Sequence, residues 1–282
     1  MAENEMGLFL RSRRDAVSPA RVGLPTGPRR RAPGLRRAEL ATLAGVSVEY
    51  ITRLEQGRDR NPSPQVLAAL ADALCLTPAE RVHLYRLTKA DSGFNCMGAA
   101  EPGREVRPTV SALLDRLERT AAVLVNRMTE ILAATDTYRT VMEHSGLFEP
   151  AHRPVLAQYV LTDPRARETF PDWDHLADQM VATLKQGPFR ADPGIAALAD
   201  QLTITAGAAF TDRVSTVPNL PAATGIIRLI HPDAGPLRLA FETLDLSADD
   251  DQRLIVYLPA DQNTAAGLDE LAGRRPGGLR AV

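Results

Sequence analysis

The sequence predicts two domains in tandem, a small all-helical domain followed by an α+β domain in which helices accompany a five-stranded antiparallel sheet. The early part of the chain holds short apolar patterns at helical spacing, each beginning or ending at a helix-capping residue. Later parts hold short apolar runs separated by turn residues, which are typical of strands. With 282 residues, the chain is also longer than one hydrophobic core comfortably fills. We therefore expect a helical domain at 1–90, a linker at 91–105 and an α+β domain at 106–282.

Charge is divided unevenly between the two expected domains. Residues 1–89 carry a net charge of +6 and residues 90–282 carry −8, which together give the −2 of the whole chain. A basic domain joined to an acidic one is typical of a protein whose basic part binds an anionic polymer. The chain has no long apolar run and no signal peptide, which favours a cytoplasmic protein without a membrane partner.

Three short helices are expected in the first part of the chain. The first spans 6–16, the second is the stretch LRRAELATLAG, and the third is VSVEYITRLEQGR. Gly45 supplies the permissive backbone that a tight turn requires, Ser47 is a good N-cap for the third helix, and Gly57 ends it. Two short helices joined by such a turn form a helix-turn-helix. The expected apolar faces of the three helices consist of Leu8, Phe9, Val17, Leu40, Leu43, Ala44, Val46, Ile51 and Leu54.

Two further helices complete the first domain, NPSPQVLAALADAL and TPAERVHLYRL. Ser63 is the expected N-cap of the former, with Pro64 at its first helical position. Thr77 and Glu80 have the spacing of a capping box at the start of the latter. We expect His83 on the exposed side of this last helix. The apolar face of the former helix consists of Val66, Leu70 and Leu74.

An arginine-rich segment, PTGPRRRAPGLRR at 25–37, lies between the first and second helices. Its prolines and glycines prevent it from continuing a helix. Its five arginines repel one another unless a polyanion neutralises them. The segment is therefore suited to contact with a partner outside the fold.

The helix-turn-helix residues resemble the XRE-type, lambda-repressor-like family, in the pattern LA.L.GVS...I.RLE.G......P....L..LA.AL from about Leu40 to Leu76. The resemblance implies double-stranded DNA as the partner, with the second helix of the motif in the major groove. It also implies a homodimer on an inverted-repeat operator. The arginine-rich segment connects the first two helices at the edge of the motif that crosses the DNA backbone, so we expect it at phosphates or an adjacent minor groove. The expected DNA-binding residues are Arg29, Arg30, Arg31, Arg36, Arg37, Ser47, Val48, Glu49, Tyr50, Thr52, Arg53, Arg58 and Arg60.

Three of these residues suit particular base edges. Arg53 can bond guanine bidentately, Glu49 can accept from a cytosine amino group, and Val48 can contact a thymine methyl group. Tyr50 either packs on the domain or hydrogen-bonds a phosphate. An alternative for Glu49 and Arg53 is a mutual ion pair on a solvated face, because they lie four residues apart on one helix.

The second domain is expected to begin with the helix VRPTVSALLDRLERT, followed by a hairpin of AAVLVNR and EILAAT with its turn at 127–129. Helix starts at Asp163, Asp172 and Asp192 mark a helical middle. The runs GIIRLIHP, PLRLAFETLDL and QRLIVYLP then form an antiparallel meander. This order suits a sheet with helices across one face, where a pocket can open between the layers. The apolar face of the first helix consists of Val110, Leu113, Leu114 and Leu117.

The stretches VLTDPRARETFPDW and FETLDLSADDDQRLIVYLPA, together with the arginine-rich helix-turn-helix region, resemble the MmyB-like regulators. These join such a DNA-binding domain to a PAS-like ligand-binding domain, so the resemblance implies a transcription regulator that senses a hydrophobic small molecule, fatty-acid-like or other. The chain departs from the family at 134–136, Ala-Thr-Asp in place of Ala-Trp-Asn, and at 210–214, where Phe-x-x-Leu-Trp is usual. Two large aromatic side chains are therefore missing, which favours a larger pocket or a different ligand.

The candidate ligand-binding residues are apolar ones on elements that are expected to face each other. The alternative for each of them is an ordinary place in the core. They are Leu124, Phe170, Trp173, Met180, Phe210, Ile227, Leu239, Phe241 and Val256.

The sequence lacks the common catalytic and metal-binding motifs. There is no G-x-S-x-G, H-E-x-x-H, Walker A or G-x-G-x-x-G pattern, and the five histidines are scattered. The two cysteines, Cys75 and Cys96, do not form a metal-ligand pattern. We expect no enzyme activity, no metal and no cofactor. The alternative to a ligand sensor is a DNA-binding regulator whose C-terminal domain is a ligand-free dimerisation or protein-interaction module.

Overall fold

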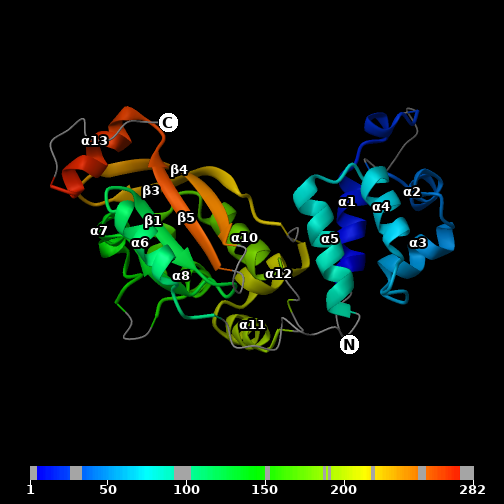
Figure 1. Ribbon diagram of the computed structural model, residues 1–282, viewed down its shortest axis with the longest axis horizontal. Coiled ribbons are helices and arrows are strands. Elements are labelled where there is room, and N and C mark those ends of the chain that lie inside the picture. Colours follow the sequence, from blue (N-terminus) through cyan, green and yellow to red (C-terminus); the bar gives the residue numbers. More distant parts are fainter. Residues whose placement is uncertain are drawn as a thin grey trace. The chain divides into compact units, whose positions relative to one another are not determined.

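The chain forms two compact units, shown in Figure 1. Unit 1 comprises 1–99 with 186–192 and 218–220, and unit 2 comprises 100–185, 193–217 and 221–282. The computed structural model describes residues 5–25, 34–91, 103–149, 153–186, 189, 192–216, 220–246 and 252–273. Within these ranges, no helix has the length and apolar character that crossing a bilayer requires.

Unit 1 contains the predicted all-helical domain. Ser63 caps its fourth α-helix by accepting a hydrogen bond from the Val66 amide at 3.3 Å. Thr77 and Glu80 form the predicted capping box, because each side chain accepts a hydrogen bond from the backbone amide of the other. The elements are α1 (Glu5–Ala16), η1 (Pro19–Val22), α2 (Arg37–Ala44), α3 (Val48–Glu55), α4 (Pro64–Ala73) and α5 (Pro78–Asp91).

The core of unit 1 corrects three sequence-based expectations. Leu8 and Leu43 are exposed, because α1 buries Met6, Phe9 and Leu10 and α2 buries Leu40 and Ala41. Phe9, Leu40 and Ala44 are buried as predicted, so only part of each predicted face is wrong. His83 is buried rather than exposed, and its ring meets the Phe9 ring edge-on at 5.0 Å. Two other predicted core residues, Leu54 and Leu70, are fully buried.

Unit 2 contains a five-stranded antiparallel sheet in the order β2-β1-β5-β4-β3, accompanied by helices (Figure 1). The α+β prediction is therefore confirmed. Its strands are β1 (Ala121–Val125), β2 (Ile131–Ala134), β3 (Thr224–His231), β4 (Gly235–Leu246) and β5 (Gln252–Pro259). Its helices are α6 (Pro108–Arg116), α7 (Asp136–Met142), η2 (Glu143–Ser145), α8 (Leu156–Thr162), α9 (Arg165–Thr169), α10 (Trp173–Leu184), α11 (Pro193–Thr205), α12 (Ala208–Thr216) and α13 (Gln262–Leu271).

The β1–β2 hairpin turns where the sequence predicts. The Asn126 side-chain oxygen accepts hydrogen bonds from the backbone amides of Met128 and Glu130 at 3.0 and 3.1 Å. Thr129 adopts a left-handed conformation with φ 62°. The Arg104 guanidinium bonds the Glu130 carboxylate at 3.0 Å, so the last residues of the expected linker pack on unit 2. Residues 92–102 of that linker lie outside the described ranges.

Strand register divides the sheet residues between two faces. Leu124 lies opposite Leu254, and both belong to a cluster with Val110 and Leu114 of α6. We call this side the α6 face. Tyr257 points the other way, and its ring stacks on Tyr138 of α7 with centroids 5.6 Å apart. On this second side, the α7 face, α13 approaches so closely that a Cβ added at Gly267 would lie 3.1 Å from the Leu237 side chain.

Candidate nucleic-acid interface and small-molecule pocket

A tight turn fixes the start of α3 relative to α2. Gly45 ends α2 in a left-handed conformation with φ 65°, which glycine adopts without strain. The Val46 amide bonds back to the Ala41 carbonyl at 3.0 Å. Ser47 then caps α3 by accepting from the Tyr50 amide at 3.1 Å. The polar residues after Ser47 therefore emerge at a defined place.

One side of α3 is buried and the other is open. Ile51 and Leu54 pack in the core of unit 1. Among the expected DNA-binding residues of the motif, Tyr50 and Thr52 are half-buried. The exposed ones are Ser47, Val48, Glu49 and Arg53. The helix therefore offers a mixed polar and apolar surface of the kind that reads base edges.

Arg53 does not use the alternative ion pair with Glu49. Its guanidinium lies 3.7 Å from the Asp59 carboxylate and 5.4 Å from the centre of the Tyr50 ring. Burial raises the pKa of the Tyr50 hydroxyl, and the nearby Asp59 raises it further, against the opposing charge of Arg53. Tyr50 thus contacts Arg53 through its ring while its hydroxyl stays neutral at physiological pH.

The remaining expected DNA-binding residues differ in their surroundings. Arg29, Arg30 and Arg31 lie outside the described residues. Arg36 precedes α2, and its backbone amide bonds the Glu39 carboxylate at 2.7 Å. Arg37 donates from Nε to Glu55 at 2.8 Å. Arg58 and Arg60 are exposed, and Arg60 Nε bonds the Gly57 carbonyl at 3.0 Å.

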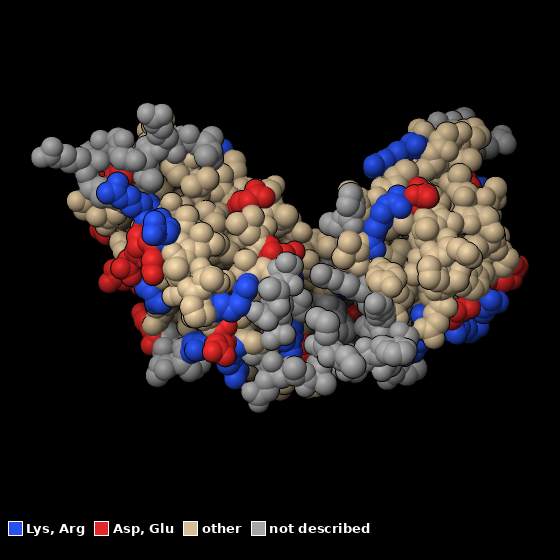
Figure 2. All heavy atoms as spheres, in the orientation of Figure 1, with Lys and Arg blue, Asp and Glu red and all other residues tan. Residues whose placement is uncertain are grey.

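Two residues of this region were not predicted from the sequence, Arg14 and Glu55. Their side chains pair at 2.6 Å and are almost completely buried. The only sequence signal for Glu55 is its place beside Leu54 and four residues after Ile51, at the edge of the buried face of α3. Figure 2 shows basic and acidic side chains interspersed over the described part of unit 1. The pairing of Arg14 with Glu55 reduces the positive charge of unit 1 that is free to attract an anion.

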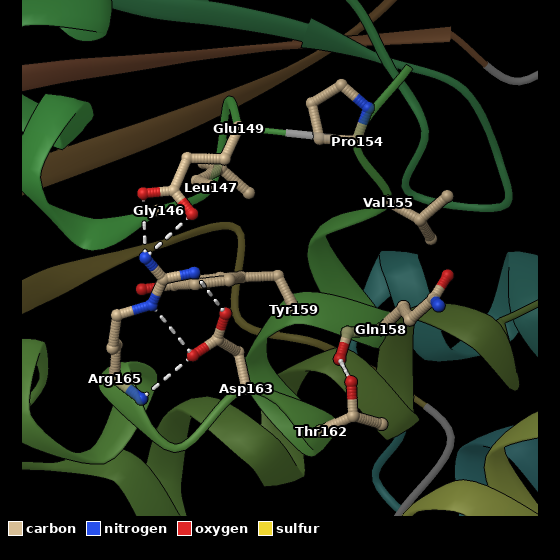
Figure 3. Close-up of a pocket in the computed structure, with 10 residues that line it drawn as sticks. All are labelled: Gly146, Leu147, Glu149, Pro154, Val155, Gln158, Tyr159, Thr162, Asp163 and Arg165. Atoms are coloured by element: carbon tan, nitrogen blue, oxygen red, sulfur yellow. Dashed lines mark hydrogen bonds and ion pairs between the residues drawn. The ribbon is translucent and has the colours of Figure 1, made fainter. Parts of the chain in front are cut away.

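Unit 2 contains a pocket of about 370 Å³ between the segment after η2 and helix α8 (Figure 3). One wall is an ion-paired cluster, in which the Arg165 guanidinium bonds Asp163 at 2.9 Å and Glu149 at 2.8 Å. The hydrogen bonds of Arg165 lower the pKa of Asp163, and those of Asp163 and Glu149 raise the pKa of Arg165. The lining residues are Gly146, Leu147, Glu149, Pro154, Val155, Gln158, Tyr159, Thr162, Asp163 and Arg165.

The nine predicted ligand-binding residues do not line this pocket, nor do they share one surface. Leu124 and Val256 pack on the α6 face. Phe241 pairs directly with Tyr257, and Leu239 lies two residues before it and pairs with Ile227. All three therefore lie on the α7 face, as Tyr257 does. They cannot all face one cavity, because neighbouring strand residues point to opposite sides of a sheet. The remaining four, Phe170, Trp173, Met180 and Phe210, lie in the helical layer.

Trp173 is held from several sides. Its indole nitrogen donates to the Val160 carbonyl at 2.7 Å. The guanidinium groups of Arg167 and Arg213 lie 3.4 and 4.9 Å from the centres of its rings. Arg213 is itself paired with Asp174 and Asp178 at 2.5 and 2.8 Å. These contacts give Trp173, at the start of α10, a structural place against α8, α9 and α12.

Two histidines come together without forming a metal site. The rings of His144 and His231 meet edge-on at 4.4 Å. In the part of the chain that the structure describes, no group of three or more His, Cys, Asp or Glu residues could hold a metal ion. His152 lies outside that part.

Two family models match the chain. A helix-turn-helix domain matches residues 5–84, and the MmyB-like transcription regulator ligand binding domain matches residues 106–271. A search of curated proteins found no match. The first match contains the exposed face of α3, and the second contains the whole sheet of unit 2.

Proposed function

The chain belongs to the family of the MmyB-like transcription regulator ligand binding domain, and from this premise we propose that it regulates transcription by binding operator DNA in response to a small molecule. The observation that carries the proposal is the open face of α3 on a unit that matches a helix-turn-helix domain. The function is divided between the units, with DNA at unit 1 and the effector at unit 2.

We propose that α3 enters the major groove, with Val48, Glu49 and Arg53 at base edges. The Tyr50 ring supports this role of Arg53, because a cation held over an aromatic face keeps a defined direction. Arg36 and Arg37, at the start of α2, and Arg29 to Arg31 before it would contact the phosphate backbone. A homodimer would place two such helices on the half-sites of an inverted repeat.

For the effector we propose a hydrophobic small molecule on the α7 face of unit 2. Ile227, Leu239 and Phe241 support this placement, because they are apolar residues on the strand face that α7 and α13 cover. The absence of two family aromatics favours a larger pocket or a different ligand, so the hydrophobic molecule is fatty-acid-like or of another kind. Ligand binding changes DNA affinity only if the ligand binds one packing of the unit more tightly than another.

The DNA-binding proposal can be tested by selecting duplexes from a random pool with the purified protein. We expect an inverted-repeat consensus, and we expect Arg53→Ala to relax the preference at one position in each half-site, with a loss of about 1–3 kcal/mol. Arg81→Ala is the control, because Arg81 pairs with Asp72 on α4 and α5, away from α3. Selection of no sequence would contradict the proposal.

The effector proposal is tested separately by native mass spectrometry of the full chain. A dimer carrying extra mass that denaturation releases would support a ligand sensor. A dimer without extra mass, with no change in DNA affinity across a panel of hydrophobic compounds, would favour an interaction module instead.

A further inference from the structure

A buried carboxylate joins three helices of unit 1. Glu55 is the last residue of α3, and its side chain is only 2% exposed. It accepts hydrogen bonds from Arg14 Nε of α1 at 2.6 Å and from Arg37 Nε of α2 at 2.8 Å. We propose that Glu55, held in place by Arg14, positions Arg37 to bind a DNA phosphate. This inference rests on the DNA-binding function proposed above.

Arg14 fixes the backbone that leads to Arg37. Its Nη1 donates to the Leu35 carbonyl at 2.7 Å, and the Leu35 amide donates back to the Arg14 carbonyl at 2.9 Å. At Gly34 an added Cβ would lie 2.3 Å from the Asp15 carbonyl oxygen, so the chain touches the end of α1 there. Arg37 follows two residues after Leu35. Its Cα position is therefore set by α1.

Glu55 then sets the direction of the Arg37 side chain. A guanidinium is a planar fork with five N–H donors, and here the single Nε–H is used by Glu55. Among the described residues, the Nη1 and Nη2 groups of Arg37 have no hydrogen-bond or ion-pair partner, and the side chain is 42% exposed. These two groups form the end of the fork that binds phosphate oxygens bidentately.

Arg14 also supplies the counter-charge that a buried carboxylate requires. Burial alone would lower the pKa of Arg14, but the hydrogen bond and charge of Glu55, followed by those of Asp15, raise it. Arg14 is the less exposed partner of Glu55, with 9% of its side chain accessible. Arg37 is therefore not needed to neutralise Glu55, and its own charge is available to a phosphate.

The test compares Arg37 variants on a duplex selected by the wild-type protein, with the dissociation constant measured by fluorescence anisotropy over a series of NaCl concentrations. Arg37→Ala should weaken binding several-fold and reduce the slope of log K against log salt by about 0.9 per subunit. Arg37→Lys should lose nearly as much affinity, because an ammonium cannot bond Glu55 and present a two-pronged fork to phosphate at the same time. Glu55→Gln should weaken binding in the wild-type background and change it less than twofold in the Arg37→Ala background.

Arg81→Ala and Arg81→Lys are matched controls, because the Arg81 side chain is also 42% exposed and is also paired with a carboxylate. Both should leave affinity and salt slope unchanged. Arg37→Lys with wild-type affinity would overturn the positioning role, since charge alone would then suffice. An undiminished effect of Glu55→Gln in the Arg37→Ala background would overturn it too, because Glu55 would act only on the fold. Failure of the wild-type protein to bind any DNA would instead overturn the proposed function.

Discussion

Several ionisable side chains of this protein are buried, and their hydrogen bonds offset the cost of removing them from water. Arg14 and Glu55 are removed from water together, and their desolvation is offset by the hydrogen bonds that Arg14 donates to Glu55, Asp15 and the Leu35 carbonyl and by the bond that Arg37 donates to Glu55. His231 is buried in the opposite state, as a neutral ring. Its Nδ1 accepts from the amides of Asp233 and Ala234 at 3.1 and 3.3 Å, so the nitrogen that forms the β3–β4 turn carries no proton.

Arg14→Met should lower the free energy of unfolding of unit 1 by about 3 kcal/mol, because it removes the buried counter-charge of a buried carboxylate. Urea denaturation followed by circular dichroism measures this. Arg81→Met removes an exposed ion pair and should cost less than about 1 kcal/mol. Equal losses of unfolding free energy for the two variants would show that burial of the Arg14–Glu55 pair adds nothing to the stability of unit 1.

Acidification should destabilise unit 2 through His231. Burial lowers the pKa of His231, the ring of His144 lowers it further, and the carboxylates of Asp233 and Glu143 oppose them. The unfolded chain therefore takes up the proton first as the pH falls. The contribution of His231 to stability is complete above about pH 6.5 and declines below it, by at most about 1.4 kcal/mol for each pH unit.

His231→Asn is the variant that tests this, because its side-chain oxygen can replace Nδ1 as the acceptor without titrating. Thermal denaturation between pH 7.5 and pH 5.5 should show a smaller loss of stability for His231→Asn than for the wild type. Parallel pH profiles for the two proteins would contradict the role of His231.

At the scale of elements, the sequence is most informative where a residue acts on its own backbone. The caps at Ser47, Ser63 and Thr77 are found as predicted, because capping depends only on neighbours in the chain. The buried side of a helix depends instead on what covers it. Leu113 of α6 is exposed for this reason, although its apolar spacing matches that of Val110 and Leu114.

The connection between η2 and α8 depends on Gly146, which has φ 78° and lies against the Arg165 guanidinium. Gly146→Ala should cost about 1–2 kcal/mol from the left-handed backbone and more than that in total, because the added methyl group also displaces Arg165. Gly207→Ala is the matched control, since Gly207 has φ 55° and no atom within 4 Å of an added Cβ. The difference between the two variants in chemical denaturation should disappear in an Arg165→Ala background. A difference that persists there would exclude Arg165 as its cause.

At the scale of the whole molecule, the sequence predicted the fold class and the family, while only part of the candidate site followed from it. Helical spacing and strand runs specify which elements form, and these led to a helix-turn-helix and a five-stranded sheet. The nine candidate pocket residues were chosen for being apolar on elements that should meet. Strand register, which places Leu124 and Phe241 on opposite faces, depends on pairings between distant segments. The partners of Glu55 were hidden for the same reason, because they lie 18 and 41 positions away.

The surroundings of Trp173 have a consequence for how the two units can be studied together. Trp173 is the only tryptophan in the chain, so all of the tryptophan emission of the protein arises from the helical layer of unit 2. Its contacts with Arg167, Arg213 and Val160 make that emission sensitive to small shifts of α8, α10 and α12. A change in this emission on adding operator DNA would show that unit 2 responds to DNA, and because linkage is reciprocal, an effector whose affinity changes on DNA binding would alter operator affinity by the same factor.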